Sequence, residues 1–102
     1  MFVNVAVYRI HPQHVDAFRK RMLRHAETCL RDEKNCVRFD VNESRTEPGT
    51  FVMYEVFRGP EDFQAHVDAE HTKDFAKTRD ENGWLAGRTL YQLSSIFPIE
   101  AS

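Results

Sequence analysis

Residues Phe2–Ile10 are FVNVAVYRI, a stretch dense in β-branched and aromatic side chains that predicts a β-strand. In an extended chain, successive side chains point to opposite faces. Both alternating sets are largely apolar here: Val3, Val5 and Val7 on one side, and Phe2, Ala6, Tyr8 and Ile10 on the other. The stretch therefore predicts a strand that is covered on both faces.

A helix is predicted next, because Pro12 suits a first helical turn and apolar residues then recur every three or four positions through Arg31. These residues are Val15, Phe18, Met22, Ala26 and Cys29. Residues 35–44 (NCVRFDVNES) alternate, with Val37, Phe39 and Val41 opposite Cys36, Arg38, Asp40 and Asn42, which predicts a strand with one polar face. The Pro48-Gly49 turn signal then connects this strand to its neighbour in a hairpin.

The second half repeats the pattern. Residues 50–58 (TFVMYEVFR) predict a strand, and Gly59-Pro60-Glu61-Asp62 is a strong helix start, with a helix expected to continue to Asn82-Gly83. Residues 88–97 (RTLYQLSSIF) predict the last strand, ended by Pro98. The order β-α-β-β-α-β predicts an α+β, ferredoxin-like fold, a split β-α-β sandwich in which both helices cover one face of a four-stranded antiparallel sheet.

The first, third and fourth predicted strands are apolar on both faces, so the sheet face away from the helices needs a cover. A second subunit that packs sheet to sheet is the simplest cover, and we expect a homodimer.

The chain has 102 residues, which predicts a single domain over residues 1–102. The net charge of −2 supplies no basic field for nucleic acid or for a membrane surface, so neither is expected as a partner. The sequence contains no membrane-spanning apolar run and no basic region typical of a signal peptide, which predicts a cytoplasmic protein. Cys29 and Cys36 are expected to be reduced structural thiols.

Two histidines are the main candidates for chemistry. His66 and His71 are five residues apart, so a straight helix would separate them by about 140° and they could not share a metal from it. A break near Ala69-Glu70 would let both point into one cavity between helix and sheet, where imidazole suits acid-base catalysis because it titrates near neutrality. The alternative is that each is a satisfied or surface histidine.

Several other residues are candidates for substrate binding. His25 lies toward the apolar side of the first helix, where core and pocket positions are equally plausible. Arg38 would anchor an anion if its strand face meets the cavity, or else pair with Asp40. Tyr54 and Trp84 offer donor groups on apolar bodies. Glu55 is the odd acid in an apolar strand and would need a partner if buried.

Motifs for bound cofactors are missing from the sequence. It contains no GxGxxG, Walker or GxSxG motif and no clustered Cys/His set, and the surface pair His11 and His14 lacks a third ligand nearby. We therefore expect neither a cofactor nor a metal.

The residues Tyr54-Glu55-Val56-Phe57, followed by His66, His71 and Phe75, resemble the antibiotic biosynthesis monooxygenase (ABM) domain family over nearly the whole chain. Within it, Arg38-Phe39-Asp40-Val41, the His66/His71 pair and Phe97-Pro98 look most like the enzymes that isomerise phosphorylated autoinducer-2. The resemblance implies a dimeric α/β barrel of ferredoxin-like subunits, each with its own pocket. Members of this family include cofactor-free oxygenases of quinols and polyphenols, haem-degrading enzymes and the isomerase.

Three functions remain open from the sequence. A cofactor-independent monooxygenase would use His66 or His71 to deprotonate a small quinol-like or enolisable carbonyl substrate, with Arg38 and Tyr54 holding the resulting anion. The isomerase of phosphorylated autoinducer-2 (4-hydroxy-5-phosphonooxypentane-2,3-dione) would return the proton to a neighbouring carbon. The third possibility is a non-catalytic small-molecule-binding or dimerisation module, because this fold has many roles.

Overall fold

The computed structural model describes residues 1–98, and its elements follow the predicted order. Two β-α-β units follow one another, the helical segment of the second is divided into two helices, and a short 3₁₀ turn precedes the first helix. The elements are β1 (Phe2–Ile10), η1 (Pro12–His14), α1 (Val15–Asp32), β2 (Cys36–Glu43), β3 (Thr50–Phe57), α2 (Pro60–Asp68), α3 (Glu70–Glu81) and β4 (Leu85–Ser94). The ferredoxin-like fold predicted from the sequence is confirmed.

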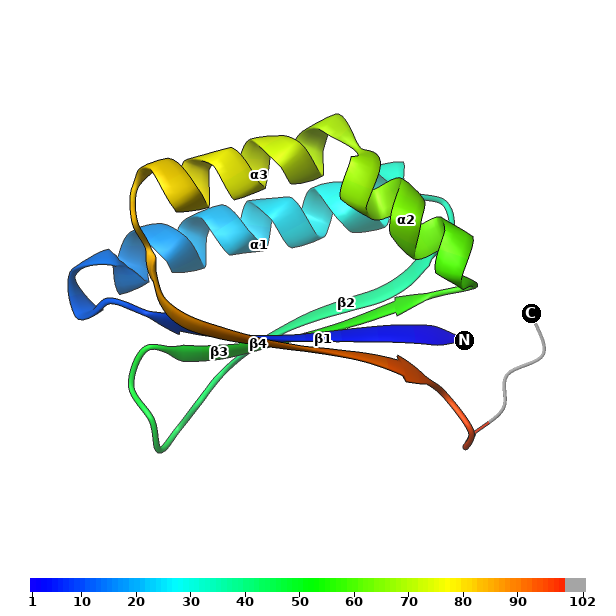
Figure 1. Ribbon diagram of the computed structural model, residues 1–102, viewed down its shortest axis with the longest axis horizontal. Helices are drawn as coiled ribbons and strands as arrows, with labels where there is room; N and C mark the ends of the chain where they lie inside the picture. Colours follow the sequence, from blue (N-terminus) through cyan, green and yellow to red (C-terminus); the bar gives the residue numbers. More distant parts are fainter. Residues whose placement is uncertain (99–102) are drawn as a thin grey trace.

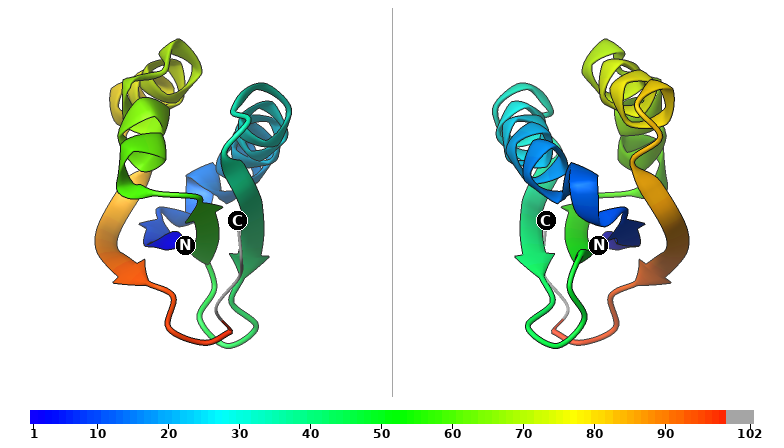
Figure 2. Two further views of the ribbon diagram at one scale, coloured as in Figure 1. Left: turned by 90° about the vertical axis from the view of Figure 1, so that its right-hand side faces the viewer. Right: turned by 90° about the vertical axis from the view of Figure 1, so that its left-hand side faces the viewer.

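The strands form one four-stranded antiparallel sheet in the order β2-β3-β1-β4. All three α-helices lie on one face of this sheet (Figure 1). Seen along the sheet, α1 lies above the β2 edge, while α2 and α3 lie above the β4 edge (Figure 2). The main core fills the layer between sheet and helices, around the fully buried Phe18, Phe51 and Phe57. None of the helices in residues 1–98 is long and apolar enough to cross a membrane.

The predicted break of the second helical segment is present at Ala69. Helix α2 ends at Asp68 and α3 begins at Glu70, and Ala69 between them is extended, with φ −67° and ψ 143°. The chain therefore changes direction between His66 and His71, which allows both side chains to approach the end of α1.

The alternation predicted for the second strand is wrong at one position. The register between β2 and β3 shifts between Cys36 and Arg38, so Val37 is an extra residue and the strand bulges there. As a result Cys36 and Phe39 are both buried toward the helices, whereas Val37 is 42% exposed. A bulge shifts the side-chain alternation by one residue, which sequence periodicity does not reveal.

The last strand lies three residues earlier than predicted. It begins at Leu85, which pairs with Ile10, and ends at Ser94, which pairs with Phe2. Since β1 itself begins at Phe2, its length sets the end of β4, and the predicted extension to Phe97 has no strand partner.

The sheet face away from the helices is covered by no helix of residues 1–98 and is largely apolar. The register aligns Val3, Val5 and Val7 of β1 with Val52, Tyr54 and Val56 of β3 and with Thr89, Tyr91 and Leu93 of β4. Tyr91 is 50% exposed and Leu93 is 46% exposed. This face is the surface for which a partner subunit is expected, and the homodimer stays a prediction.

Candidate active site

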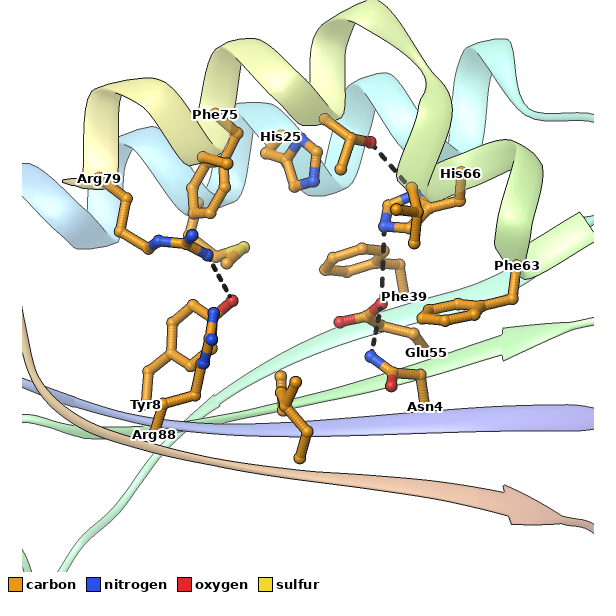
Figure 3. Close-up of a pocket in the computed structure, with 16 residues that line it drawn as sticks. Asn4, Tyr8, His25, Phe39, Glu55, Phe63, His66, Phe75, Arg79 and Arg88 are labelled. Atoms are coloured by element: carbon orange, nitrogen blue, oxygen red, sulfur yellow. Dashed lines mark hydrogen bonds and ion pairs between the residues drawn. The ribbon is translucent and has the colours of Figure 1, made fainter. Parts of the chain in front are cut away.

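A cavity of about 270 Å³ lies between the sheet and the helices (Figure 3). Polar side chains occupy two opposite ends of it: Asn4, Glu55 and His66 at one end, and Tyr8, Arg79 and Arg88 at the other. Apolar side chains line the space between the two ends, among them Met22, Phe39, Phe75 and Leu90. The cavity is therefore suited to a mainly apolar molecule with a polar group at each end.

Glu55 is a carboxylate buried at the first polar end. It points toward the helices because, at every second position of β3, it shares one face of the strand with the buried Met53 and Phe57. Asn4 Nδ2 donates to Oε1 of Glu55 at 3.3 Å, and Nε2 of His66 lies 3.8 Å from the same oxygen. Burial raises the pKa of Glu55 to about 7, although the nearby His66 and the hydrogen bond from Asn4 act to lower it. This carboxyl can therefore exchange a proton near neutral pH.

His66 lies between two carboxyl groups. It is in the last turn of α2, and its side chain is only 7% exposed. Its Nδ1 is 2.9 Å from Oε2 of Glu33, whereas its Nε2 faces Glu55 at the cavity. A carboxylate can only accept a hydrogen bond, so Nδ1 carries a ring proton, and in the neutral ring Nε2 keeps its lone pair for the cavity.

Glu33 is the residue that brings the two predicted histidines together. It follows directly after α1, where its backbone N–H donates to the carbonyl oxygen of Cys29 at 3.0 Å. Its carboxylate accepts hydrogen bonds from Nδ1 of His66 and from Nε2 of His71. Burial alone would raise the pKa of Glu33, but the two histidine hydrogen bonds outweigh it and hold that pKa below its ordinary value. Glu33 is therefore an ionised partner for both rings.

His71 does not line the cavity. It lies in the first turn of α3, where its Nε2 contacts Oε2 of Glu33, and it is not among the residues that line the cavity. The structure thus brings His66 and His71 to one carboxylate, but only His66 reaches the cavity.

His25 does line the cavity. It is buried on α1, and its ring stacks on Phe75 with centroids 4.6 Å apart. Burial, together with the nearby His66 and His71, lowers the pKa of His25 to about 3. His25 is therefore a neutral ring at physiological pH.

The second polar end of the cavity is built around Arg79. Its Nη1 donates to the hydroxyl of Tyr8 at 2.9 Å, and its Nε and Nη2 bind the carboxylate of Asp80 at 2.8 and 3.1 Å. Arg88 lines the same end, and β4 places it directly beside Tyr8. Because Asp80 offsets only one of the two guanidinium charges, this end can hold an anionic or electron-rich group.

Arg38 and Tyr54 do not meet the histidines. They lie on the open face of the sheet, where Arg38 binds Asp40 at 2.8 Å and its guanidinium sits 5.6 Å from the centre of the Tyr54 ring. The reason is the pleat of β3, which points Tyr54 away from the helices whenever Glu55 points toward them. The structure thus realises the alternative pairing of Arg38 with Asp40.

Trp84 is a core residue. It is 6% exposed and its ring meets Phe18 edge to face at 6.1 Å, outside the cavity lining. Sequence reasoning missed Glu33, Arg79 and Tyr8 as site residues. Glu33 had one usable signal, since it lies four residues after Cys29 and continues the buried face of α1.

Comparison with known protein families identifies the family of this chain. The sequence profile of the antibiotic biosynthesis monooxygenase (ABM) family matches residues 1–78, and the chain belongs to this family. A comparison with curated proteins found no match.

Solved structures share the fold. A protein from Nitrosomonas europaea, whose name places it among the antibiotic biosynthesis monooxygenases, superposes with a TM-score of 0.89 at 24% identity, over 97% of this chain and 93% of that one. A similarly named protein from Caulobacter crescentus gives a TM-score of 0.86 at 20% identity, over 93% and 89% of the two chains. A third, from Deinococcus radiodurans, gives 0.82 at 17% identity, over 99% and 100%. At these identities the likeness concerns the fold alone.

Proposed function

We propose that this protein is a cofactor-independent monooxygenase that acts on a small quinol-like or enolisable carbonyl substrate. The observation that carries the proposal is the placement of His66, whose Nδ1 is held by Glu33 at 2.9 Å while its Nε2 faces an otherwise largely apolar cavity. Family membership supports the same class of chemistry.

His66 is the base in this proposal. Its Nε2 takes a proton from the substrate, and the carboxylate of Glu33 stabilises the imidazolium that forms. Glu55 in its protonated form donates a hydrogen bond to the substrate oxyanion, which its pKa of about 7 permits. Oδ1 of Asn4 is buried without a hydrogen-bond partner among residues 1–98, and it is available to accept from a substrate hydroxyl.

The substrate anion then supplies the electrons for dioxygen. A carbanion next to a carbonyl forms a bond to one oxygen atom of O₂, and the resulting peroxide anion takes up the proton from His66 to give a hydroperoxide. Loss of water from this hydroperoxide leaves a new carbonyl, so that a CH₂ group and O₂ become C=O and H₂O. The protein's part is to remove the proton, hold the anion and keep water out with the apolar lining.

The functional unit in this proposal is a homodimer. The open face of the sheet supports it, because Tyr91 and Leu93 are about half exposed there beside the valines of β1 and β3. Two copies of this face packed together would cover both apolar surfaces.

A second candidate is the isomerase of phosphorylated autoinducer-2. The observation that favours it is the pair of guanidinium groups, Arg79 and Arg88, at the end of the cavity away from His66. A phosphate held there would place an enolisable dione toward His66, which would move a proton between neighbouring carbons.

Dioxygen dependence distinguishes these functions. Metal-free protein is incubated with a panel of quinols, anthrones and the phosphorylated dione, and dioxygen uptake is followed together with product formation. We expect dioxygen uptake with one oxygenated product and one water per turnover. Product formation from the dione without oxygen would instead establish the isomerase, and saturable binding without turnover of any compound would establish a binding module.

A further inference from the structure

Four potential metal ligands meet where α1, α2 and α3 come together. Cys29, Glu33, His66 and His71 each contribute one donor atom, and these four atoms lie within 4.8 Å of one another. The Cys29 sulfur is 3.7 Å from Nδ1 of His66, and that nitrogen is 2.9 Å from Oε2 of Glu33. The cluster lies behind His66, on the side of the ring that faces away from Glu55.

The fold assembles the cluster from two short sequence pairs. Cys29 and Glu33 are four residues apart at the end of α1, so they share one face of the helix. His66 ends α2 and His71 begins α3, and the extended Ala69 between the helices turns both rings toward Glu33. Because the helix breaks at Ala69, the two histidines are not separated as they would be on one straight helix.

The donor set matches a zinc-class divalent ion. Zinc takes thiolate, imidazole and carboxylate ligands at about 2.0–2.3 Å in a tetrahedron, which places neighbouring donors about 3.3–3.8 Å apart. The observed distance of 3.7 Å between the Cys29 sulfur and Nδ1 of His66 already fits this spacing. The carboxylate oxygen of Glu33 is too close to the two imidazole nitrogens, and it has to move away from them by up to about 1 Å. One thiolate and one carboxylate balance the double positive charge, so the buried site would be neutral.

Two further side chains lie within reach of these ligands and can orient them. Nε2 of His25 lies 3.6 Å from the Cys29 sulfur, and Oε1 of Glu55 lies 3.8 Å from the free nitrogen of His66. Ligating histidines commonly donate their second N–H to a carboxylate, which fixes the ring orientation.

We propose that Cys29, Glu33, His66 and His71 form a binding site for one divalent metal ion of the zinc class. On binding, the Cys29 thiol releases its proton to solvent, and the ring proton of His66 moves from Nδ1 to Nε2. The cavity-facing nitrogen of His66 then carries a hydrogen and cannot accept one from a substrate. The metal therefore acts as an off-switch for the base, and this consequence rests on the proposed function.

The test uses the full-length protein after dialysis against a chelator. Zinc binding is measured by calorimetry, and Co²⁺ is added as a spectroscopic probe that reports tetrahedral geometry and thiolate ligation by its absorption. The variants are Cys29→Ser and His71→Ala. The matched controls are Cys36→Ser, a buried cysteine outside the cluster, and His14→Ala, a half-buried histidine outside the cluster.

We expect one zinc per chain in the wild type and in both controls, with a thiolate-to-cobalt charge-transfer band. We expect Cys29→Ser to lose this band. We expect His71→Ala to lower the zinc affinity at least tenfold, which is the smallest loss typical of disturbed metal sites. Absence of the band in the wild type, or wild-type zinc affinity in both variants, overturns the site. Equal turnover of zinc-loaded and metal-free wild type overturns the switch. The cobalt spectrum tests the metal site independently, even if no substrate is turned over.

Discussion

Oε2 of Glu33 and Nδ1 of His66 lie 2.9 Å apart although 33 residues separate them in the sequence. This contact joins the end of α1 to the end of α2, and it fixes which nitrogen of His66 holds the ring proton. The lone pair that remains points to the cavity, where a substrate proton can reach it. The proposed chemistry depends on this orientation.

Replacement Glu33→Gln tests Glu33 as a positioning residue. The amide can donate to Nδ1, which favours the wrong tautomer and removes the charge that stabilises the imidazolium. We expect kcat to fall by about 10² or more with KM little changed, as for other disturbed acid-base groups. The measurement is steady-state dioxygen uptake alongside the thermal unfolding midpoint. Partial recovery of kcat in Glu33→Asp would separate positioning from a packing defect, whereas unchanged kcat in Glu33→Gln would contradict the assigned role.

The raised pKa of Glu55 makes stability depend on pH. Below the ordinary value of 4.5 the carboxyl is protonated in the folded and the unfolded chain, so burial costs least there. As the pH rises toward about 7, the unfolded chain ionises first, and the free energy of unfolding decreases by about 3 kcal/mol at 1.36 kcal/mol per pH unit. Glu55→Gln should lack this decrease.

Urea unfolding of the wild type and of Glu55→Gln between pH 4 and 8 measures the effect. His25 is present in both proteins, so its own loss of stability as the pH falls below 6.5 cancels in the difference. A constant difference between the two proteins across this range would show that the pKa of Glu55 is not raised in the folded state.

The sequence predicted the order of elements and the break at Ala69 because those depend on local periodicity and turn chemistry. It misplaced Val37 because a bulge depends on how β2 pairs with β3. It could not find the cluster around Glu33, since that contact depends on the crossing of α1 by the α2–α3 corner. Arg38 and Tyr54 were grouped with the histidines because the direction in which each strand faces was not known.

Arg88→Ala tests the second polar end of the cavity. Arg88 is exposed at the rim, so its removal should leave the fold intact. We expect KM for a substrate with an anionic group to rise about tenfold or more, since a charge-assisted hydrogen bond contributes on the order of 1.5–3 kcal/mol. Arg58→Ala, an exposed arginine outside the cavity lining, is the matched control. Equal KM values for both variants would argue against an anion site.

Assembly is tested by sedimentation equilibrium at micromolar concentration. The chain has a mass of 12.0 kDa, so a homodimer gives twice this value, 24 kDa. Tyr91→Glu places a charge on the open sheet face and should shift the mass toward that of the single chain, whereas Arg24→Glu on α1 should not. A wild-type mass near 12 kDa would contradict the dimer.

The most direct test of the account is the turnover of His66→Ala in metal-free protein, measured by dioxygen uptake against His14→Ala as a histidine control outside the cavity. If Nε2 of His66 is the base, kcat falls by about 10² to 10⁴, while the circular dichroism spectrum and the sedimentation mass stay those of the wild type. Wild-type kcat in a folded His66→Ala protein would contradict the account.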